Sequence, residues 1–204
     1  MAWHLAHEFT NAGIKINRII NRSSVTGRKL AQEIGSEFSN NLEIAADNSQ
    51  LILMALSDSC LNQVIEKINP GNSILVHTSG SIDMSVFKDR ATNYGVFYPF
   101  QTLSQNIKTD FSKIPVCIEA SDEKTYTSIS NLASKLSKSV YKIDSEQRRK
   151  LHLAGIMANN FTNHLLTLTF DYLNKNGIDK NLIFPLLKEL TDEFPSPNRR
   201  SISF

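Results

Sequence analysis

Hydroxyl, amide and imidazole side chains gather in four short segments, each of which follows an apolar run of strand length. These segments are residues 21–24, 57–59, 77–81 and 98–102. Hydroxyl and amide groups can hold phosphate and ribose oxygens through hydrogen bonds, and an imidazole can also donate a proton. Loops that follow successive parallel strands meet at one edge of a sheet, so the four segments predict a single ligand site.

The first segment indicates which dinucleotide the site would bind. A fold that prefers NAD usually has Asp or Glu after its second strand, where the carboxylate binds the ribose 2′-hydroxyl. Here Asn21 is followed by Arg22, Ser23 and Ser24, with Arg28 one helical turn on. A guanidinium with two hydroxyls would bind a 2′-phosphate that a carboxylate would repel. These residues predict NADP, used as NADPH; the alternative is that Arg22 is a surface residue at a strand end.

The next two segments are candidates for contact with the nicotinamide ribose and with the substrate. Ser57 and Asp58 are expected beside that ribose. His77 ends a buried strand and could donate a proton, while Ser79 and Gly80 would allow a carboxylate or carbonyl to approach closely. The alternative is a capping turn with a core histidine. No spacing of Ser, His and Asp supports nucleophilic catalysis.

A helix expected from residue 144 to about residue 175 carries a third group of polar residues. His152, Asn159 and Asn163 are spaced by seven and four residues, which places them near one face of a regular helix. Polar groups on an apolar face are costly unless they are paired. They either satisfy buried backbone at a helix contact or line a cleft, and we favour the cleft. His152 and His164 lack a carboxylate at ligand spacing, so no metal site is predicted.

The elements that must position these residues alternate between strand and helix. Strand-like runs occur at 14–20, 51–56, 73–77, 95–98, 116–119 and 140–143, and helical patterns at 2–11, 25–34, 60–68, 82–89 and 123–136. This alternation predicts an α/β fold with a doubly wound, mostly parallel Rossmann-type sheet. Beyond residue 144 the pattern is helical. We therefore expect a nucleotide-binding domain over residues 1–143 and a helical domain over residues 144–204.

Composition narrows the possible partners. The chain has 204 residues, 41% of them hydrophobic, and a net charge of +2, which favours neither nucleic acid nor a membrane as partner. The basic clusters at 148–150 and 199–200 are interpreted as a solvated helix face and a tail. Neither Cys60 nor Cys117 belongs to a metal-binding pattern, so we expect free thiols in a reducing, cytoplasmic compartment.

The chain begins within the expected pattern. A helix starts directly after Met1 and a strand and a basic turn follow it, as in the middle of a dinucleotide-binding βαβ unit. We therefore expect the first strand and its glycine-rich turn to precede residue 1. Without that strand, its neighbours would lack partners for their backbone groups, and the isolated chain would be poorly soluble or molten. The tail over 195–204 is expected to be disordered.

Several segments resemble one bacterial family, namely residues 2–6, 77–81, 94–102, 118–120 and 151–164. They resemble uncharacterised Rossmann-like proteins with a C-terminal domain of unknown function, DUF2520, similar in plan to pyrroline-5-carboxylate reductase and F420-dependent NADP oxidoreductases. The resemblance implies an NADP-binding domain, a helical domain and homodimers of the full-length form. Family members usually have a Gly-x-Gly-Asn-x turn directly before Ala2 and continue beyond Pro195, so both ends are expected to be truncated.

Three hypotheses for function follow. The first is an NADP-dependent oxidoreductase that acts on an unknown small-molecule substrate. The second is a non-catalytic nucleotide-binding or regulatory module, because related β-hydroxyacid dehydrogenases use a Lys three residues before an Asn-Asn pair and Ile156 stands at that position. The third is an inactive fragment. Under the first hypothesis the candidate catalytic residues are His77, His152 and Asn159, and the candidate substrate-binding residues are Ser79, Gly80, Tyr98 and Asn163.

Overall fold

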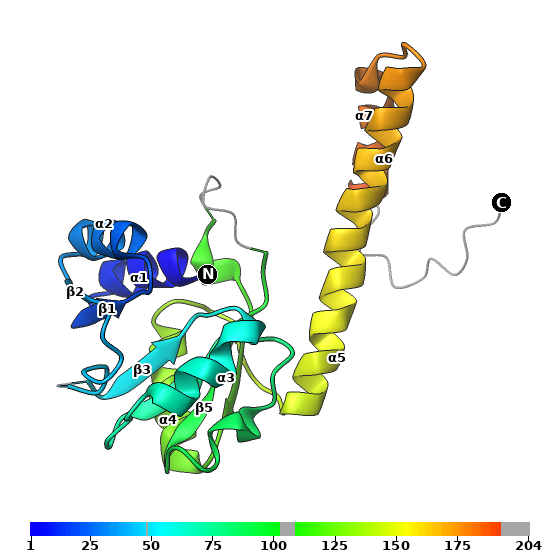
Figure 1. Cartoon of the computed structure of the whole chain (residues 1–204). Helices are drawn as coiled ribbons and strands as arrows, with labels where there is room; N and C mark the ends of the chain where they lie inside the picture. The colour runs from blue at the N-terminus through cyan, green and yellow to red at the C-terminus, as the bar shows by residue number, and fades with distance from the viewer. Residues whose placement is uncertain (48, 103–108, 193–204) are drawn as a thin grey trace. The chain divides into compact units, whose positions relative to one another are not determined.

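The computed structural model describes residues 1–47, 49–102 and 109–192, which form two compact units (Figure 1). The first unit spans Met1–Ala154 and the second begins at Gly155. A compact unit defined by contacts need not fold independently, so the division into domains 1–143 and 144–204 stays a prediction. The tail at 195–204, with its basic pair, lies outside the described residues.

A five-stranded sheet forms the centre of the first unit. Its strands lie side by side in the order β3 (Leu51–Met54), β4 (Ile74–His77), β5 (Tyr94–Pro99), β6 (Val116–Ala120) and β7 (Val140–Lys142). Neighbouring strands are parallel except for β5 and β6, which are antiparallel. The predicted mostly parallel α/β sheet is therefore confirmed, and all five strand positions were expected from the apolar runs.

Helices accompany this sheet along the chain. They are α1 (Ala2–Asn11), α2 (Ser24–Ile34), α3 (Asp58–Lys67), α4 (Glu123–Ser134) and α5 (Ser145–Gly155), with 3-10 helices η1 (Met84–Phe87) and η2 (Phe111–Lys113). The helix predicted over 60–68 begins two residues earlier, because Ser57 is the cap residue and Asp58 is the first residue of α3. The helix predicted over 82–89 is only the 3-10 turn η1, which the side chain of Asp83 caps.

The register of the strands decides which side chains share a face of the sheet. His77 of β4 lies opposite Val96 of β5, and Val96 lies opposite Glu119 of β6. Paired residues point to the same face, as do residues two apart along one strand. Tyr98 therefore shares this face with His77 and Glu119, and these three polar side chains lie on one side of the central strands.

The opposite face of the central strands is apolar. There Phe97 and Ile118 are buried in one cluster with Leu5 and Phe9 of α1 and with Ile129 of α4. The rings of Phe9 and Phe97 lie 5.7 Å apart between centroids. Burying each such side chain stabilises the fold by about 1.5–3 kcal/mol. The sheet is thus anchored from one side, and its other side carries the polar candidates.

A second, two-stranded sheet lies with α1 and α2 in the blue part of Figure 1. Its strands, β1 (Arg18–Ile20) and β2 (Glu37–Ser39), are parallel, and α2 connects them. A Cβ at Gly27 of α2 would lie 2.3 Å from the Phe38 ring, so this glycine lets the helix lie close to β2. The strand predicted over 14–20 is confirmed only for its last three residues, and the sequence did not predict β2.

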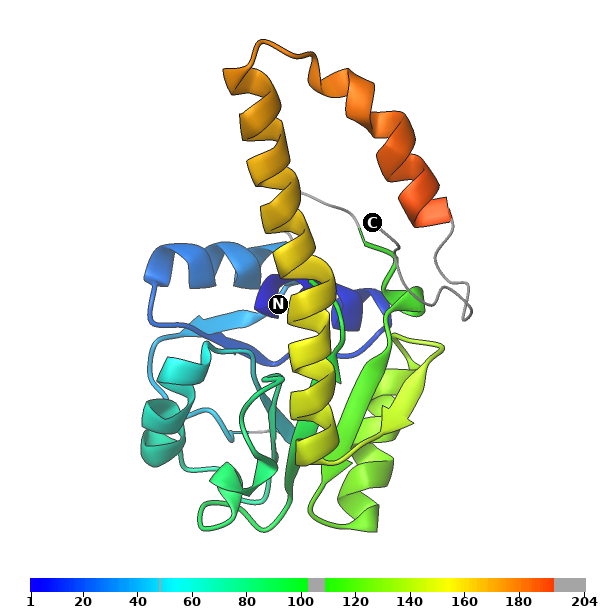
Figure 2. The ribbon, with the colours of Figure 1, turned by 90° about the vertical axis from the view of Figure 1, so that its right-hand side faces the viewer.

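The second unit is helical. It contains the π-helix η3 (Ile156–Phe161), α6 (Thr162–Lys175), η4 (Lys180–Ile183) and α7 (Phe184–Asp192). The turn after α6, visible in Figure 2, contains Gly177 with a φ of 67°, and α6 ends at Lys175, as expected from the sequence. The long α-helix predicted from residue 144 is interrupted by η3, because six residues adopt the wider π turn. None of the residues of η3 or α6 is buried.

Candidate functional site

Three of the four polar segments meet at the carboxyl end of the five-stranded sheet. Residues 57–59 follow β3, residues 77–81 follow β4, and Tyr98 lies near the end of β5. The hydroxyl of Ser81 donates a hydrogen bond to Oδ2 of Asp58, which joins the first two loops. The backbone N–H of Thr78 also reaches the carbonyl of Met54 at the end of β3, 3.3 Å away. This edge is where ligands bind in open α/β sheets.

A tyrosine and a histidine form a hydrogen-bonded pair at this edge. The Tyr98 hydroxyl lies 2.9 Å from Nδ1 of His152, and the two rings meet edge to face with centroids 5.9 Å apart. Burial raises the pKa of Tyr98 to about 12, so the phenol stays protonated at neutral pH. Because Nδ1 of His152 faces Tyr98, Nε2 is the ring nitrogen left for another partner.

Gly80 allows the pair to form. A Cβ at Gly80 would lie 2.6 Å from Cγ of His152 and 2.9 Å from Cζ of Tyr98, so any side chain there would displace one of the rings. Gly80 follows β4, Tyr98 belongs to β5 and His152 belongs to α5, so three distant parts of the first unit converge here. We call these three residues the Tyr98–His152 cluster. Its phenol and imidazole are groups that can deliver a proton.

His77 occupies a different position from that cluster. Its side chain is fully buried, and its Nδ1 accepts a hydrogen bond from the backbone N–H of Ser79 at 3.1 Å. Burial, aided by the charge of Arg148, lowers the pKa of His77 to about 3, so the neutral ring carries its proton on Nε2. That Nε2 is buried without a hydrogen-bond partner. His77 therefore shapes the loop after β4, and its role as a proton donor stays a prediction.

The Ser79 hydroxyl is also used within the loop after β4. Its oxygen accepts hydrogen bonds from the backbone N–H groups of Ser81 at 3.1 Å and Ile82 at 3.0 Å. These bonds close a tight turn that leads Gly80 past the His152 ring. The residue is 8% exposed, so contact between Ser79 and a substrate remains a prediction.

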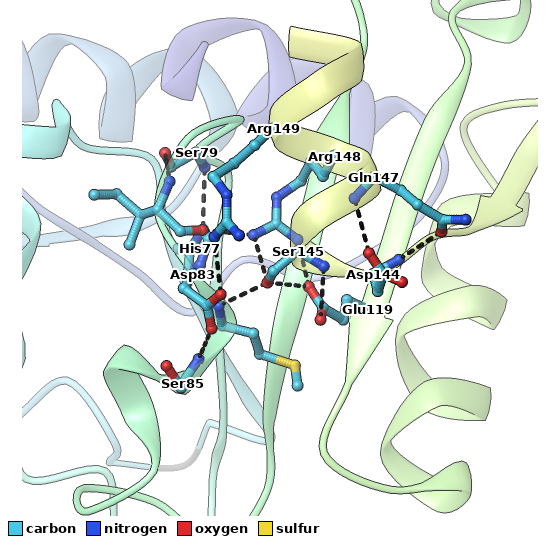
Figure 3. A network of polar contacts seen from close by, with 12 residues as sticks. His77, Ser79, Asp83, Ser85, Glu119, Asp144, Ser145, Gln147, Arg148 and Arg149 are labelled. Carbon is cyan, nitrogen blue, oxygen red and sulfur yellow. Dashed lines mark hydrogen bonds and ion pairs between the residues drawn. The ribbon is translucent and has the colours of Figure 1, made fainter. Parts of the chain in front are cut away.

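A buried charged network beside the cluster was missed by sequence reasoning (Figure 3). Arg148 of α5 is 1% exposed and forms an ion pair with Glu119 of β6. Its guanidinium also donates to the Ile82 carbonyl and to Ser145 Oγ, the latter at 3.0 Å. Ser145 in turn binds both carboxylate oxygens of Glu119, with its hydroxyl at 2.6 Å and its backbone N–H at 3.0 Å. We call Glu119, Ser145 and Arg148 the Arg148 network.

The interpretation of residues 148–150 as a solvated helix face was wrong for Arg148. Arg149 and Lys150 are exposed, whereas Arg148 is buried because Glu119 neutralises it and oxygen atoms accept from both terminal nitrogens. One signal in the sequence could have indicated this pairing. Glu119 is a lone carboxylate in the otherwise apolar run of β6, and such a group needs a partner when its strand is buried.

The helix α5 begins with a capping box formed by Asp144 and Gln147. The backbone N–H of Gln147 donates to Oδ1 of Asp144 at 2.8 Å, and the backbone N–H of Asp144 donates to Oε1 of Gln147 at 3.1 Å. These reciprocal bonds satisfy donors that a helix start otherwise leaves unpaired. The start of α5 is thus fixed both by its cap and by the neighbouring Arg148 network.

The predicted phosphate-binding segment lies between β1 and α2. Arg22, Ser23 and Ser24 are exposed, and Ser23 is the N-cap of α2, with its hydroxyl accepting from the Thr26 N–H at 3.4 Å. Asn21 braces the turn by accepting from the Ser23 N–H at 3.1 Å. A helix N-terminus attracts anions, and an exposed guanidinium beside it adds positive charge. These residues fit a phosphate group.

Three further residues of the predicted cofactor site, Arg28, Ser57 and Asp58, have different surroundings. Arg28 lies over the ring of Phe38, 5.3 Å from its centroid. Ser57 is exposed at the start of α3, with its hydroxyl 3.2 Å from that of Ser59. Asp58 is exposed as well, although its carboxylate is bound by Ser81. Contacts of Ser57 and Asp58 with a nicotinamide ribose stay predictions.

Asn159 and Asn163 belong to the second unit. The side-chain amide of Asn163 donates to Oδ1 of Asn159 at 3.0 Å, as expected for residues one helical turn apart. The face that they were expected to share with His152 assumed a regular α-helix, and the π-helix η3 changes that period. Their catalytic and substrate-binding roles therefore stay predictions.

Two searches of the described ranges, 1–47, 49–102 and 109–192, bear on other kinds of site. In these ranges no group of three or more His, Cys, Asp or Glu side chains is placed to hold a metal ion. Each helix in the same ranges is too short or too polar to cross a membrane. Both cysteines are free thiols, Cys117 being buried and Cys60 partly so.

Comparison with known proteins identifies the family. Residues 114–198 match the sequence model of a domain of unknown function, DUF2520. The structure of BF3122 from Bacteroides fragilis, provisionally described as an NADP oxidoreductase, is 36% identical to this chain, with a TM-score of 0.84. The match covers 94% of this chain and 75% of BF3122. The chain belongs to the DUF2520 family. The resemblance predicted from the sequence is thereby confirmed.

More distant structures resemble this DUF2520 protein in fold alone. An imine reductase from Myxococcus stipitatus in complex with NADP⁺ is 11% identical, with a TM-score of 0.68 over 92% of this chain and 68% of the reductase. A 1-pyrroline-5-carboxylate reductase from Streptococcus pyogenes is 10% identical, with a TM-score of 0.73 over 100% of this chain and 78% of the reductase. No curated protein matches the sequence. These likenesses establish a Rossmann-like fold.

Proposed function

We propose that this DUF2520 protein is an oxidoreductase that uses NADPH to reduce a small-molecule substrate. The observation that carries the proposal is the Tyr98–His152 cluster, a phenol and an imidazole in hydrogen-bond contact at the carboxyl end of the sheet. The similarity to BF3122, which is 36% identical to this chain and is provisionally described as an NADP oxidoreductase, supports the reaction class. The exposed residues at the start of α2 support the choice of NADP over NAD.

The cofactor would be held at two places on the first unit. Arg22, Ser23 and Ser24 would bind its 2′-phosphate, with Asn21 bracing the turn. Ser57 and Asp58, after β3, would lie beside the nicotinamide ribose. The contact between Asp58 and Ser81 would hold the loops after β3 and β4 in place there. When bound, the cofactor supplies the hydride. The chain itself must supply orientation and a proton.

His152 is the residue that we assign as proton donor. A protonated His152 ring donates its Nδ1 proton to the Tyr98 oxygen and presents its Nε2 proton to the substrate. After the Nε2 proton has moved to the substrate, the neutral ring keeps its bond to Tyr98. Tyr98 thus orients the ring, and its high pKa keeps the phenol uncharged throughout. Asn159 and Asn163 are kept as a proposed catalytic residue and a proposed substrate-binding residue.

Oxidation of NADPH across a panel of imines, keto acids and aldehydes tests this assignment. We expect His152→Ala to lower kcat by about 100-fold to 10,000-fold, the usual contribution of a general acid, without weakening NADPH binding. Tyr98→Phe should lower kcat by a smaller factor, because it removes the orienting hydroxyl and leaves the imidazole. An undiminished kcat in His152→Ala would overturn the assignment of His152.

The non-catalytic module remains the second candidate, and Ile156 is the observation that favours it. If Asn159 and Asn160 match the Asn-Asn pair of related β-hydroxyacid dehydrogenases, Ile156 stands where those enzymes use lysine, and its aliphatic side chain cannot exchange a proton. Saturable NADPH binding without oxidation by any compound of the panel would favour the module. Turnover of any of these compounds would favour the enzyme.

We also propose that the full-length protein is a cytoplasmic homodimer. The second unit exposes large apolar side chains, among them Leu165, Tyr172 and Leu182, which are 63%, 66% and 73% exposed. Such exposure is unusual for a monomer and favours a protein partner. The free thiols support a reducing compartment. Light scattering after size-exclusion chromatography should give twice the chain mass, and a monomeric mass at high concentration would contradict the dimer.

A further inference from the structure

We propose that Arg148 is a positioning residue that holds His152 against Tyr98 by locking the start of α5 onto the sheet. The proposal deepens the function proposed above, because it explains how the assigned proton donor is kept in place. It requires no role for Arg148 in contact with substrate or cofactor. The two terminal nitrogens of its buried guanidinium are instead bound by protein oxygens.

The first observation is the set of segments that Arg148 joins. Its guanidinium contacts Glu119 on β6, the Ile82 carbonyl in the loop after β4, and Ser145 in the first turn of α5 (Figure 3). Ser145 extends the network by accepting from the Met84 N–H at 3.0 Å. A guanidinium presents its donors in a rigid planar fork, so these contacts restrict the position of α5 in more than one direction.

The second observation is that two of these segments, the loop after β4 and α5, carry Gly80 and His152, and that the third, β6, pairs with the strand of Tyr98. Ile82 lies two residues beyond Gly80 in the same loop. Glu119 pairs with Val96 on β5, two residues before Tyr98 on the same face. Ile82 is therefore close to Gly80 along its loop, and Glu119 lies on the strand next to that of Tyr98. A movement of α5 relative to these anchors would change the distances from the His152 ring to Gly80 and to Tyr98.

The third observation is the spacing along α5. Arg148 and His152 are four residues apart, so they lie on the same face of the helix, about 6 Å apart along its axis. Only one helical turn separates the fixed guanidinium from the imidazole, and a turn of α-helix is stiff. Arg149, the next residue, has a side chain that is 46% exposed and pairs with Asp83 at the surface. It provides a matched control on the same helix.

The test is a histidine spectrum of the free protein, which needs neither cofactor nor substrate. In ¹⁵N-histidine-labelled protein, the Nδ1 signal of His152, assigned with His152→Ala, should report its hydrogen bond and should move in Tyr98→Phe. We expect Arg148→Met to move that signal in the same direction, while the signals of His4, His7 and His164 stay in place. Arg149→Met should leave all of them unchanged. A purely structural loss would instead broaden or shift all the signals together.

Kinetics on the same variants give a second readout. Arg148→Met should lower kcat by about 100-fold with little change in the KM for NADPH, because a misplacement of about 1 Å is enough for such a loss. Arg148→Lys should not restore kcat, since an ammonium cannot reproduce the planar fork. If no substrate of the panel is turned over, the spectrum still decides the positioning role, so the two proposals can fail separately.

A second variant covers the case in which Arg148→Met does not fold. Glu119→Gln keeps the shape of the partner and removes its charge, and we expect it to move the His152 Nδ1 signal in the same direction by a smaller amount. A wild-type His152 signal in folded Arg148→Met would overturn the proposal. If only Glu119→Gln folds, a wild-type signal in that variant overturns it.

Discussion

His77 and His152 lie near the same end of the sheet and differ in what their ring nitrogens can reach. Nδ1 of His77 is bound by the loop of Ser79, and its Nε2 is enclosed by protein. Nδ1 of His152 is bound by Tyr98, and the half-buried ring leaves Nε2 for a further partner. The imidazole of His77 therefore shapes a loop, whereas that of His152 is suited to proton transfer.

The buried His77 predicts a pH dependence of stability. Its pKa is about 3 in the folded chain and 6.5 when exposed, so between these values the unfolded chain binds a proton that the folded chain does not. The free energy of unfolding should therefore fall as the pH drops from 6.5 towards 3, by up to about 1.4 kcal/mol per pH unit, and this contribution should be constant above 6.5.

His77→Asn isolates this contribution, because the asparagine carbonyl can still accept from the Ser79 N–H and does not titrate. Denaturant unfolding of both proteins between pH 4 and pH 8 should give a stability difference that shrinks on acidification. A difference between the two proteins that is the same at every pH would show that His77 does not resist protonation in the folded chain.

Gly80 gives a second prediction at this scale. Gly80→Ala should displace the His152 ring, lowering kcat and destabilising the fold by about 1–3 kcal/mol, as overpacking does. In Gly80→Ala/His152→Ala the clash with the imidazole is gone. The double variant should therefore lose less unfolding free energy than the sum of the losses in the two single variants. Urea unfolding of the four proteins measures this coupling. Additive losses would mean that the His152 ring does not contact Gly80.

The sequence identified Gly80, Tyr98 and His152 as candidates because each is a polar or small residue at a strand end or in an apolar helix. It did not pair them, since the contact depends on the course of α5 over the sheet. Glu119 and Arg148 were missed for a related reason. Twenty-nine residues separate them, and the clustering of Arg148 with two exposed basic residues favoured a solvated interpretation.

At the scale of elements, the start of α2 has two functions that substitution can separate. Ser23 caps the helix and is proposed to bind the 2′-phosphate. Ser23→Asn and Ser23→Asp both keep a good cap, so neither should change the free energy of unfolding by more than about 0.5 kcal/mol. The aspartate adds a negative charge, and its NADPH affinity should fall by about tenfold relative to the asparagine variant.

Cofactor titration and thermal unfolding of the two Ser23 variants check this prediction. Ser23→Ala serves as the reference for the cap and should lose about 1 kcal/mol of stability. Equal NADPH affinities in the asparagine and aspartate variants would remove Ser23 from the proposed phosphate site. Ser23 would also be removed from the proposed phosphate site if the NADPH affinity of each variant fell only in proportion to its loss of stability.

Elements with strong apolar patterns were the ones that the sequence predicted well. The apolar runs of β3 to β7 and the helical patterns of α1 to α4 are local signals, and each led to an element of the structure. β2 was missed because Glu37, Phe38 and Ser39 do not form an apolar run. The π-helix η3 was missed because apolar periodicity cannot distinguish one wide turn within a long helix.

At the scale of the whole molecule, the alternation of strands and helices correctly predicted the fold class. It did not predict that β5 and β6 run antiparallel, because an apolar run carries no direction. The order of the strands likewise depends on packing between distant segments, as in the pairing of β3 with β4 across α3. The direction and the order of the strands are therefore determined by packing in the folded core.

The most direct test of the account is a fluorescence titration of the wild-type chain with NADPH and with NADH. An NADP-dependent oxidoreductase whose Arg22, Ser23 and Ser24 hold the 2′-phosphate should bind NADPH saturably, and about tenfold or more tightly than NADH. No saturation at millimolar NADPH would contradict cofactor binding by this chain, and equal affinities for the two dinucleotides would contradict the phosphate site at the start of α2.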